Sequence, residues 1–354
     1  MKHLQLKEGD RLRRQCIGVD VSKKKFTFCL CQSTEQDQHF YTKPKEFENS
    51  ESGFRHLLEW SEKEVDSSVP HSFLMEVTGC YHESLAIFLA RKGQNVFVVH
   101  ANKAKNFARL SGQRTKTDIV DSRMLATMGC DTANLKAWPL PEETLLHLRE
   151  MSRLSEQLGK SRVQVLGRIE AVTHSGFVDK TVLNAHKAQL RSIEKLQASN
   201  KKKMDELING NDRLRTGIRN LESIKCIGHK TAVLVVAETF GFHQMNNAKQ
   251  VASYAGLDVR KSQSGSVDKK GHMTKRGNAH LRTSLYFPAM VASWSNPQLM
   301  EDYDRICASH PQSKNIALVA LERKLLCLMY ALWKSGKEWD PEYGRDKKQK
   351  EAMS

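Results

Sequence analysis

The first hundred residues alternate between short apolar runs and polar turns. The runs CIGVDV and FTFCL, between Cys16 and Leu30, predict two strands joined as a hairpin across Ser22 and the lysines at 23–25. A third strand is expected near His39–Thr42. Helices are predicted over 51–62 and 81–92, and buried strands over 72–78 and 95–100. The order βββαβαβα predicts a mixed α/β sheet covered by helices, with functional side chains at strand carboxyl ends and on adjoining helices.

A change in pattern follows Trp138. The stretch PLPEE places two prolines and two acids together, which is typical of a hinge and a helix start. From about 142 to 222 the chain is charged and poor in glycine, with apolar residues at helical spacing. Because Arg162 and the SGF at 175–177 interrupt this pattern, it predicts an antiparallel helical hairpin rather than one unbroken coiled coil.

The last third is expected to be mainly helical. LESIKCIGHKTAVLVVAETFG, from residue 221, resembles a helix-hairpin-helix whose turn could offer N–H groups to a phosphate, and a plain helical connection is the alternative. The glycine-containing polar stretch 260–278 is expected to be a flexible loop, followed by two or three helices ending near Trp333. We therefore divide the chain into domains at 1–140, 141–221 and 222–340, with a disordered basic tail at 341–354.

Charge changes this picture most. With 56 Lys and Arg against 40 Asp and Glu in 354 residues, the net charge is +16, which favours a nucleic-acid partner over a merely soluble basic protein but does not separate RNA from DNA. The eight cysteines form no CxxC pair, which argues against structural zinc and favours a reducing compartment. No apolar leader or membrane-length run is present, so we expect a soluble cytoplasmic protein with no membrane partner.

Four acids are candidates for metal chemistry. Asp20 ends the first strand and Glu76 ends a central one, each in an apolar context where an unpaired charge is costly. Asp118 and Asp121 have i, i+3 spacing and share one helix face. Carboxylates that converge from such positions can hold divalent cations for phosphate chemistry, whereas each acid alone is usually a solvated or capping residue.

A serine is the second candidate. Ser264 lies in KSQSGSVDKKGHMTKRGN, with Gly265 beside it and Lys275 and Arg276 downstream. A serine that attacks DNA must be exposed and needs cations to hold the phosphate. A Ser-Gly pair is more often just a turn, and Ser262 and Ser266 are equally available on chemical grounds.

Several segments, in order, resemble one known family. They are IGVDVSKKKF, MEVTGCY, RTKTDIVDSRMLA, and the block from LESIKCIGHKTA through YAGLDVRKSQSGS to MTKRGNAHLRTSLYFPAMVA. This succession resembles the insertion-sequence transposases of the IS one-ten group and the related pilin-gene DNA invertases. The resemblance covers nearly the whole chain, and neither the TKTDxxDxRMLA string nor the SG-to-TKRGN-to-LR succession is broken.

The resemblance implies a RuvC-like domain of the RNase H fold with a DEDD acidic set. Carried over, this set falls on Asp20, Glu76, Asp118 and Asp121, as ligands of Mg²⁺ or Mn²⁺. It also implies a second domain whose serine, Ser264 here, attacks the DNA phosphodiester and forms a transient phosphoserine. A metal-only nuclease or junction resolvase, and a non-catalytic nucleic-acid-binding protein, are the alternatives.

The resemblance further implies nucleic-acid and protein partners. In this family an element-encoded structured bridge RNA pairs with donor and target DNA, and the proteins form dimers and tetramers with composite sites, with 142–222 as the dimerisation element here. The implied location is the nucleoid of a prokaryotic cell. Lys116 and Arg123 are candidate contacts to the scissile phosphates, although exposed helix cations are usually only solvated. Three further nucleic-acid-binding candidates could stabilise the transition state; they are Lys275, Arg276 and Arg282.

Overall fold

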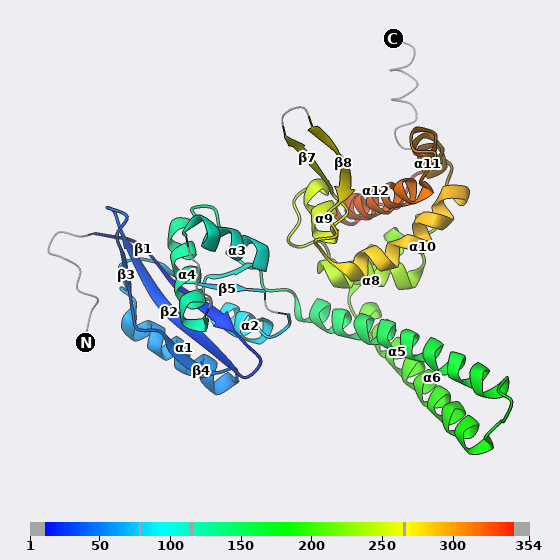
Figure 1. The fold of residues 1–354 in the computed structure, drawn as a ribbon, viewed down its shortest axis with the longest axis horizontal. Coiled ribbons are helices and arrows are strands. Elements are labelled where there is room, and N and C mark those ends of the chain that lie inside the picture. The colour runs from blue at the N-terminus through cyan, green and yellow to red at the C-terminus, as the bar shows by residue number, and fades with distance from the viewer. Residues whose placement is uncertain (1–10, 78, 113–116, 265–266, 343–354) are drawn as a thin grey trace, which may run out of the picture. The chain divides into compact units, whose positions relative to one another are not determined.

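The computed structural model describes residues 11–77, 79–112, 117–264 and 267–342, and from 260 to 272 only the backbone is described. The chain divides into two compact units, Met1–Leu140 and Pro141–Ser354 (Figure 1). The predicted disordered tail lies almost entirely outside the described residues.

One mixed sheet forms the centre of the first unit. Its strands are β1 (Leu12–Val21), β2 (Lys25–Thr34), β3 (His39–Tyr41), β4 (Lys45–Glu48), β5 (His71–Glu76) and β6 (Val96–Val99). The order is β3-β2-β1-β5-β6, and β4 pairs with the other end of the β2 edge that β3 occupies. β1 is antiparallel to β2 and parallel to β5, which is parallel to β6. This order confirms the predicted RNase H-like fold.

Helices cover both faces of this sheet. α1 (Glu51–Glu64) and α2 (Glu83–Arg91) pack on one face, while α3 (Ala101–Leu110) and α4 (Asp118–Asp131) cover the other (Figure 1). Strand residues alternate between the two cores. Ile17 and Val19 join the core under α1 and α2, whereas Cys16 of β1 and Leu74 of β5 join the core under α4. Even-numbered residues of β1 and β5 therefore face α4.

Helix α4 lies unusually close to β1. A Cβ atom added at Gly18 would stand 2.1 Å from Ala126 N and 2.2 Å from Ser122 O. One added at Gly129 would stand 2.1 Å from Cys16 Sγ. Since higher helix numbers meet lower strand numbers, α4 runs antiparallel to β1, and its first turn lies toward the carboxyl end of that strand.

We expect Gly18→Ala to lower the free energy of unfolding by about 3 kcal/mol or more, because the methyl group meets backbone atoms that cannot rotate away. Denaturant titration followed by tryptophan fluorescence measures the loss. Gly159→Ala is the matched control, since nothing lies within 4 Å of a Cβ at this position in a helix, where alanine is favoured. Equal stability of the two variants would contradict the close approach.

A long helical hairpin begins the second unit. α5 (Glu143–Thr173) and α6 (Lys180–Asn209) are joined by six residues and pack through Leu158, Val165 and Ile193. The predicted antiparallel hairpin is confirmed, with its turn at the SGF interruption. Arg162 is accommodated by an ion pair with Glu194 on α6.

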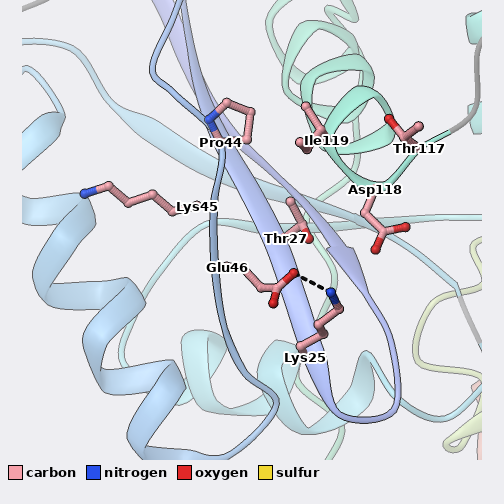
Figure 2. Close-up of a pocket in the computed structure, with 8 residues that line it drawn as sticks. All are labelled: Lys25, Thr27, Pro44, Lys45, Glu46, Thr117, Asp118 and Ile119. Carbon is pink, nitrogen blue, oxygen red and sulfur yellow. Dashed lines mark hydrogen bonds and ion pairs between the residues drawn. The ribbon is translucent and has the colours of Figure 1, made fainter.

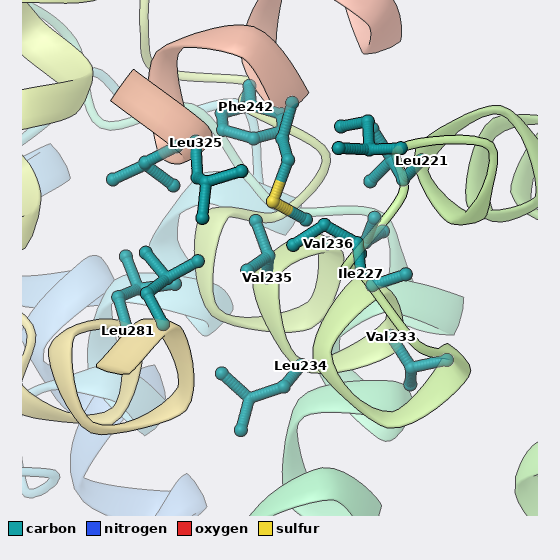
Figure 3. Packing of buried hydrophobic residues seen from close by; sticks show 14 of the residues in the cluster. Leu221, Ile227, Val233, Leu234, Val235, Val236, Phe242, Leu281 and Leu325 are labelled. Atoms are coloured by element: carbon teal, nitrogen blue, oxygen red, sulfur yellow. The ribbon is translucent and has the colours of Figure 1, made fainter. Parts of the chain in front are cut away.

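A helical core follows the hairpin. It contains α7 (Asp212–Glu222), α8 (His229–Thr239), α9 (Ala248–Ala255), α10 (Ala279–Ser295), α11 (Pro297–Ser309) and α12 (Lys314–Ser335). Six consecutive apolar residues of α8, Ala232 to Ala237, are buried, and Glu238 after them is buried too (Figure 3). The α7-turn-α8 segment matches the predicted helix-hairpin-helix-like element, with Cys226 of the turn at φ 115°. No helix in the described ranges is long and apolar enough to cross a membrane.

The predicted flexible loop is wrong over most of its length. Two strands, β7 (Val259–Ser264) and β8 (Val267–Met273), pair antiparallel in this stretch. Ser264 of β7 pairs with Val267 of β8 at the end of the ladder. The apolar pattern of the sequence does not reveal these strands because most of their residues are polar. Strands pair through backbone groups, so they can form without apolar side chains.

Candidate active site

Two of the candidate acids end neighbouring strands. Val19 of β1 pairs with Met75 of β5, so Asp20 and Glu76 are the next residues along two parallel strands about 5 Å apart. Both are half-buried. They have the same parity as Gly18 and Leu74, so they belong to the face that α4 covers.

The other two acids begin α4. Thr117 caps the helix by accepting a hydrogen bond from Val120 N at 3.3 Å, and Asp118 and Asp121 lie in the first turn. Asp118 is exposed and Asp121 is half-buried. Because α4 is antiparallel to β1, this turn lies at the same end of the sheet as the carboxyl ends of β1 and β5. The fold thus brings all four predicted acids to one end of one sheet face.

Their role as metal ligands stays a prediction. Within the described ranges, no three His, Cys, Asp or Glu side chains are grouped so as to hold a metal ion by themselves. The helix dipole also favours acids in a first turn without any metal. Hence the placement suits a cation site that draws some of its ligands from elsewhere.

A cavity of about 500 Å³ adjoins Asp118 (Figure 2). The cavity could not be predicted from the sequence, because one of its walls is the edge strand β4. This strand is polar, so no apolar run indicates it. Two lining residues are bonded to each other, since Lys25 Nζ donates a hydrogen bond of 2.6 Å to Glu46. The Glu46 carboxylate raises the pKa of Lys25, and the charge of Asp118 adds to this rise. The lining residues are Lys25, Thr27, Pro44, Lys45, Glu46, Thr117, Asp118 and Ile119.

Two of the candidate cations are close in sequence to the acids of α4. Arg123 is exposed on α4, and its guanidinium carbon lies 5.7 Å from the centroid of the Tyr41 ring. This contact orients the side chain while leaving it accessible. Lys116 lies outside the described residues.

In the second unit, Ser264 is the last residue of β7. Lys275 and Arg276 follow β8 and are exposed. Their backbone is fixed against the end of α9, since Lys275 N donates to Gly256 O at 3.2 Å. A Cβ at Gly277 would stand 2.4 Å from Gly256 N, so only glycine fits there. Two cations are thereby held on a rigid segment that links the serine-bearing hairpin to α10.

Arg282 differs from these two exposed cations. Its Nη1 donates to Ala255 O at 2.7 Å, which ties α10 to α9. Burial raises the pKa of Glu322, on α12, to about 7, and the charge of Arg282 opposes that rise. A packing role accounts for Arg282 without any contact to nucleic acid.

A buried carboxylate that sequence analysis did not single out joins three segments of this unit. Glu238 of α8 accepts hydrogen bonds from Arg153 Nε at 2.7 Å and Arg153 Nη2 at 3.0 Å. Asn278 Nδ2 donates to it at 2.6 Å, and Tyr254 OH donates to its backbone oxygen at 2.9 Å. Burial raises the pKa of Glu238, but the bonds from Arg153 and Asn278 outweigh burial and lower it. Its one sequence signal is a charge inside the apolar run AVLVVAET.

Comparisons with known proteins agree with this architecture. A family model described as "Transposase" matches residues 17–178, which include the four acids. A second, described as "Transposase IS116/IS110/IS902 family", matches residues 218–304, which include Ser264 and the cations after it. Together the two ranges span more than half of the chain.

Curated relatives point the same way. The "Pilin gene-inverting protein" of Moraxella bovis is 26% identical over 325 residues, or 92% of this chain and 97% of that protein. The protein of the same name from Moraxella lacunata has the same identity and coverage. A transposase for insertion sequence element IS1111A from Coxiella burnetii is 34% identical over 67 residues, 19% of this chain and 18% of that one. With an RNase H-like unit and a helical unit that each match a transposase model, this chain belongs to the IS110 family of transposases.

Proposed function

We propose that this transposase cleaves and rejoins DNA through a serine nucleophile, assisted by a divalent metal ion at the four acids and directed by a structured RNA. The placement of Asp20, Glu76, Asp118 and Asp121 at one end of one sheet face carries the proposal. A DNA phosphate at that end would meet acids from two strands and one helix.

The donor set fits Mg²⁺ or Mn²⁺ by its chemistry. Both ions prefer oxygen ligands, and Mg²⁺ in proteins is commonly held by one or two carboxylates together with substrate phosphates and water. Ligands from phosphate and water would allow the acids to hold a cation although the described side chains form no group of three ligands. A bound cation would stabilise the charge that develops on the phosphate during displacement.

In the proposed reaction, the Ser264 hydroxyl attacks the phosphorus and forms a phosphoserine bond as the bond from phosphorus to a deoxyribose oxygen breaks, and the serine proton is balanced by protonation of that leaving oxygen. Rejoining reverses this step with a different DNA hydroxyl, so phosphoester bonds are conserved and no nucleotide cofactor is consumed. Lys275 and Arg276 suit the stabilisation of the phosphate charge, because they are exposed and sit on a fixed backbone. Arg123 and Lys116 would contact DNA near the acids.

RNA and oligomer partners complete the proposal. The net charge of +16 suits two polyanions at once. Several exposed apolar residues lie along the helical hairpin, which supports a role in assembling dimers and tetramers; they are Leu154, Val163, Leu166, Phe177, Val178, Val182 and Leu196. The same chemistry would serve transposition or, as the names of the Moraxella relatives indicate for those proteins, gene inversion.

An in vitro recombination assay tests this function. Purified full-length protein is incubated with DNA that carries the element ends, with and without the flanking noncoding RNA and Mg²⁺. We expect joined products and a detergent-stable protein–DNA adduct only when both are present. Joined products in equal yield without RNA would refute guidance. Nicked DNA that is never rejoined would support a metal-only nuclease or junction resolvase instead.

A further inference from the structure

The strand residues that line the cavity beside Asp118 lie in one row across the sheet with two of the acidic residues. Glu46 of β4 pairs with Thr27 of β2, and Thr27 pairs with Asp20 of β1. Glu76 comes next on β5. These four residues form a continuous row across the sheet, in which Glu46 and Asp20 are separated by two strand spacings, about 10 Å. Thr27 itself lines the cavity, so the row leads from the acids into the cavity within one strand spacing, about 5 Å.

The chemistry of the lining fits a sugar-phosphate unit. Thr27 and Thr117 contribute hydroxyl groups, and Pro44 and Ile119 provide apolar surface against which a sugar or base can lie. A volume of about 500 Å³ is within the range of small-ligand pockets. The cavity is therefore large enough for one nucleotide of a longer strand.

Of the two lysines among the described lining residues, one is directed into this space. Lys25 lies beside Glu46 and donates to it, whereas Lys45 extends away, with its Nζ 5.6 Å from the centroid of the Trp60 ring (Figure 2). Asp118 and Glu46 would both repel a phosphate, so among the described lining residues Lys25 is the one placed to hold a backbone phosphate here. The Lys25–Glu46 pair is half-exposed, and such pairs contribute little to stability.

We propose that this cavity is a DNA-backbone subsite in which Lys25 exchanges the Glu46 carboxylate for the phosphate next to the one held at the acidic residues. This inference rests on the proposed function, since it takes the acids to act on DNA. It assigns opposite effects to the two partners of the ion pair: Lys25 attracts the strand, and Glu46 competes with it.

The test measures DNA binding by fluorescence anisotropy with the full-length protein and a labelled 20-base-pair duplex, in Ca²⁺ so that cleavage does not interfere. We expect Lys25→Ala to reduce the slope of log affinity against log salt concentration by about 1, the contribution of one phosphate contact. Lys25→Arg should restore the slope. Glu46→Gln should keep the slope and tighten binding, because the competing carboxylate is gone.

Lys63→Ala is the matched control. Lys63 is an exposed cation on α1, across the sheet from α4, so its removal changes the net charge equally but leaves the cavity intact. Equal slopes for Lys25→Ala and Lys63→Ala would overturn the subsite. So would a loss of slope confined to duplex RNA of the same length, or weaker binding by Glu46→Gln.

Strand transfer by Asp118→Asn distinguishes failure of the subsite from failure of the proposed function. If this variant loses strand transfer while Lys25→Ala keeps the wild-type slope, the proposed function stands and the subsite falls. If Asp118→Asn retains full strand transfer, the proposed role of the acids falls, whatever the slopes are.

Discussion

Replacement of Asp118 by asparagine is expected to slow DNA strand transfer by about 10³-fold or more. Asparagine keeps the size of the side chain but removes the charge that a divalent cation needs. A loss of 10³-fold corresponds to about 4 kcal/mol in activation free energy. Since Asp118 is exposed in the first turn of α4, the free energy of unfolding should fall by only about 1 kcal/mol or less. Single-turnover kinetics and denaturant titration measure the two quantities.

The matched control is Asp131→Asn. Asp131 ends the same helix at the far end from the acidic residues and forms an ion pair of 2.7 Å with His39. The Asp131→Asn variant should retain nearly wild-type strand transfer. Manganese binding, followed by electron paramagnetic resonance, should weaken in Asp118→Asn and not in Asp131→Asn. If both variants lose activity equally, the defect belongs to helix α4 as a whole and not to a metal ligand.

Replacement of Ser264 by alanine is expected to abolish the covalent protein–DNA adduct completely. Alanine lacks the hydroxyl oxygen that would form the phosphoserine bond, and no remaining atom of this side chain can replace it. The backbone hairpin should persist, because the pairing of Ser264 with Val267 uses main-chain groups. Denaturing gel electrophoresis of reactions with labelled DNA detects the adduct.

Ser262→Ala and Ser266→Ala are the matched controls, because both residues lie within two positions of Ser264. Each should still form adduct. Adduct that survives Ser264→Ala and disappears with one of these would reassign the nucleophile. Strand transfer that survives all three changes, with no adduct in the wild type, would favour attack by water or a DNA hydroxyl.

The central sheet and the helical hairpin could be predicted because apolar periodicity determines them. Strands such as FTFCLC bury nearly every residue, and the helical stretches repeat apolar residues every three or four positions. β4 and the β7–β8 pair were missed for the opposite reason. KEFE is an exposed edge strand, and the hairpin around Ser264 is polar, so neither segment carries the apolar alternation by which strands are recognised.

The candidate site was predictable only in part. Strand ends and i, i+3 spacing singled out the four acids, since each signal is local in the sequence. The partners of Lys25 and Glu238 were not accessible in this way. Glu46 is 21 residues from Lys25, and Arg153 is 85 residues from Glu238, so these contacts follow from how whole elements pack. The backbone contact at Gly18 was equally hidden, because the sequence shows a glycine but not the helix above it.

The buried Glu238 carboxylate joins the helical hairpin to the segment that follows the two exposed cations. Arg153 donates hydrogen bonds to this carboxylate from α5, and Asn278 donates one from the segment just after Lys275 and Arg276. From Arg153 to the end of α5 the helix extends roughly 30 Å. Because one carboxylate accepts bonds from both residues, a change in where α5 places Arg153 would also alter the site that holds Asn278, next to the backbone that presents the two cations.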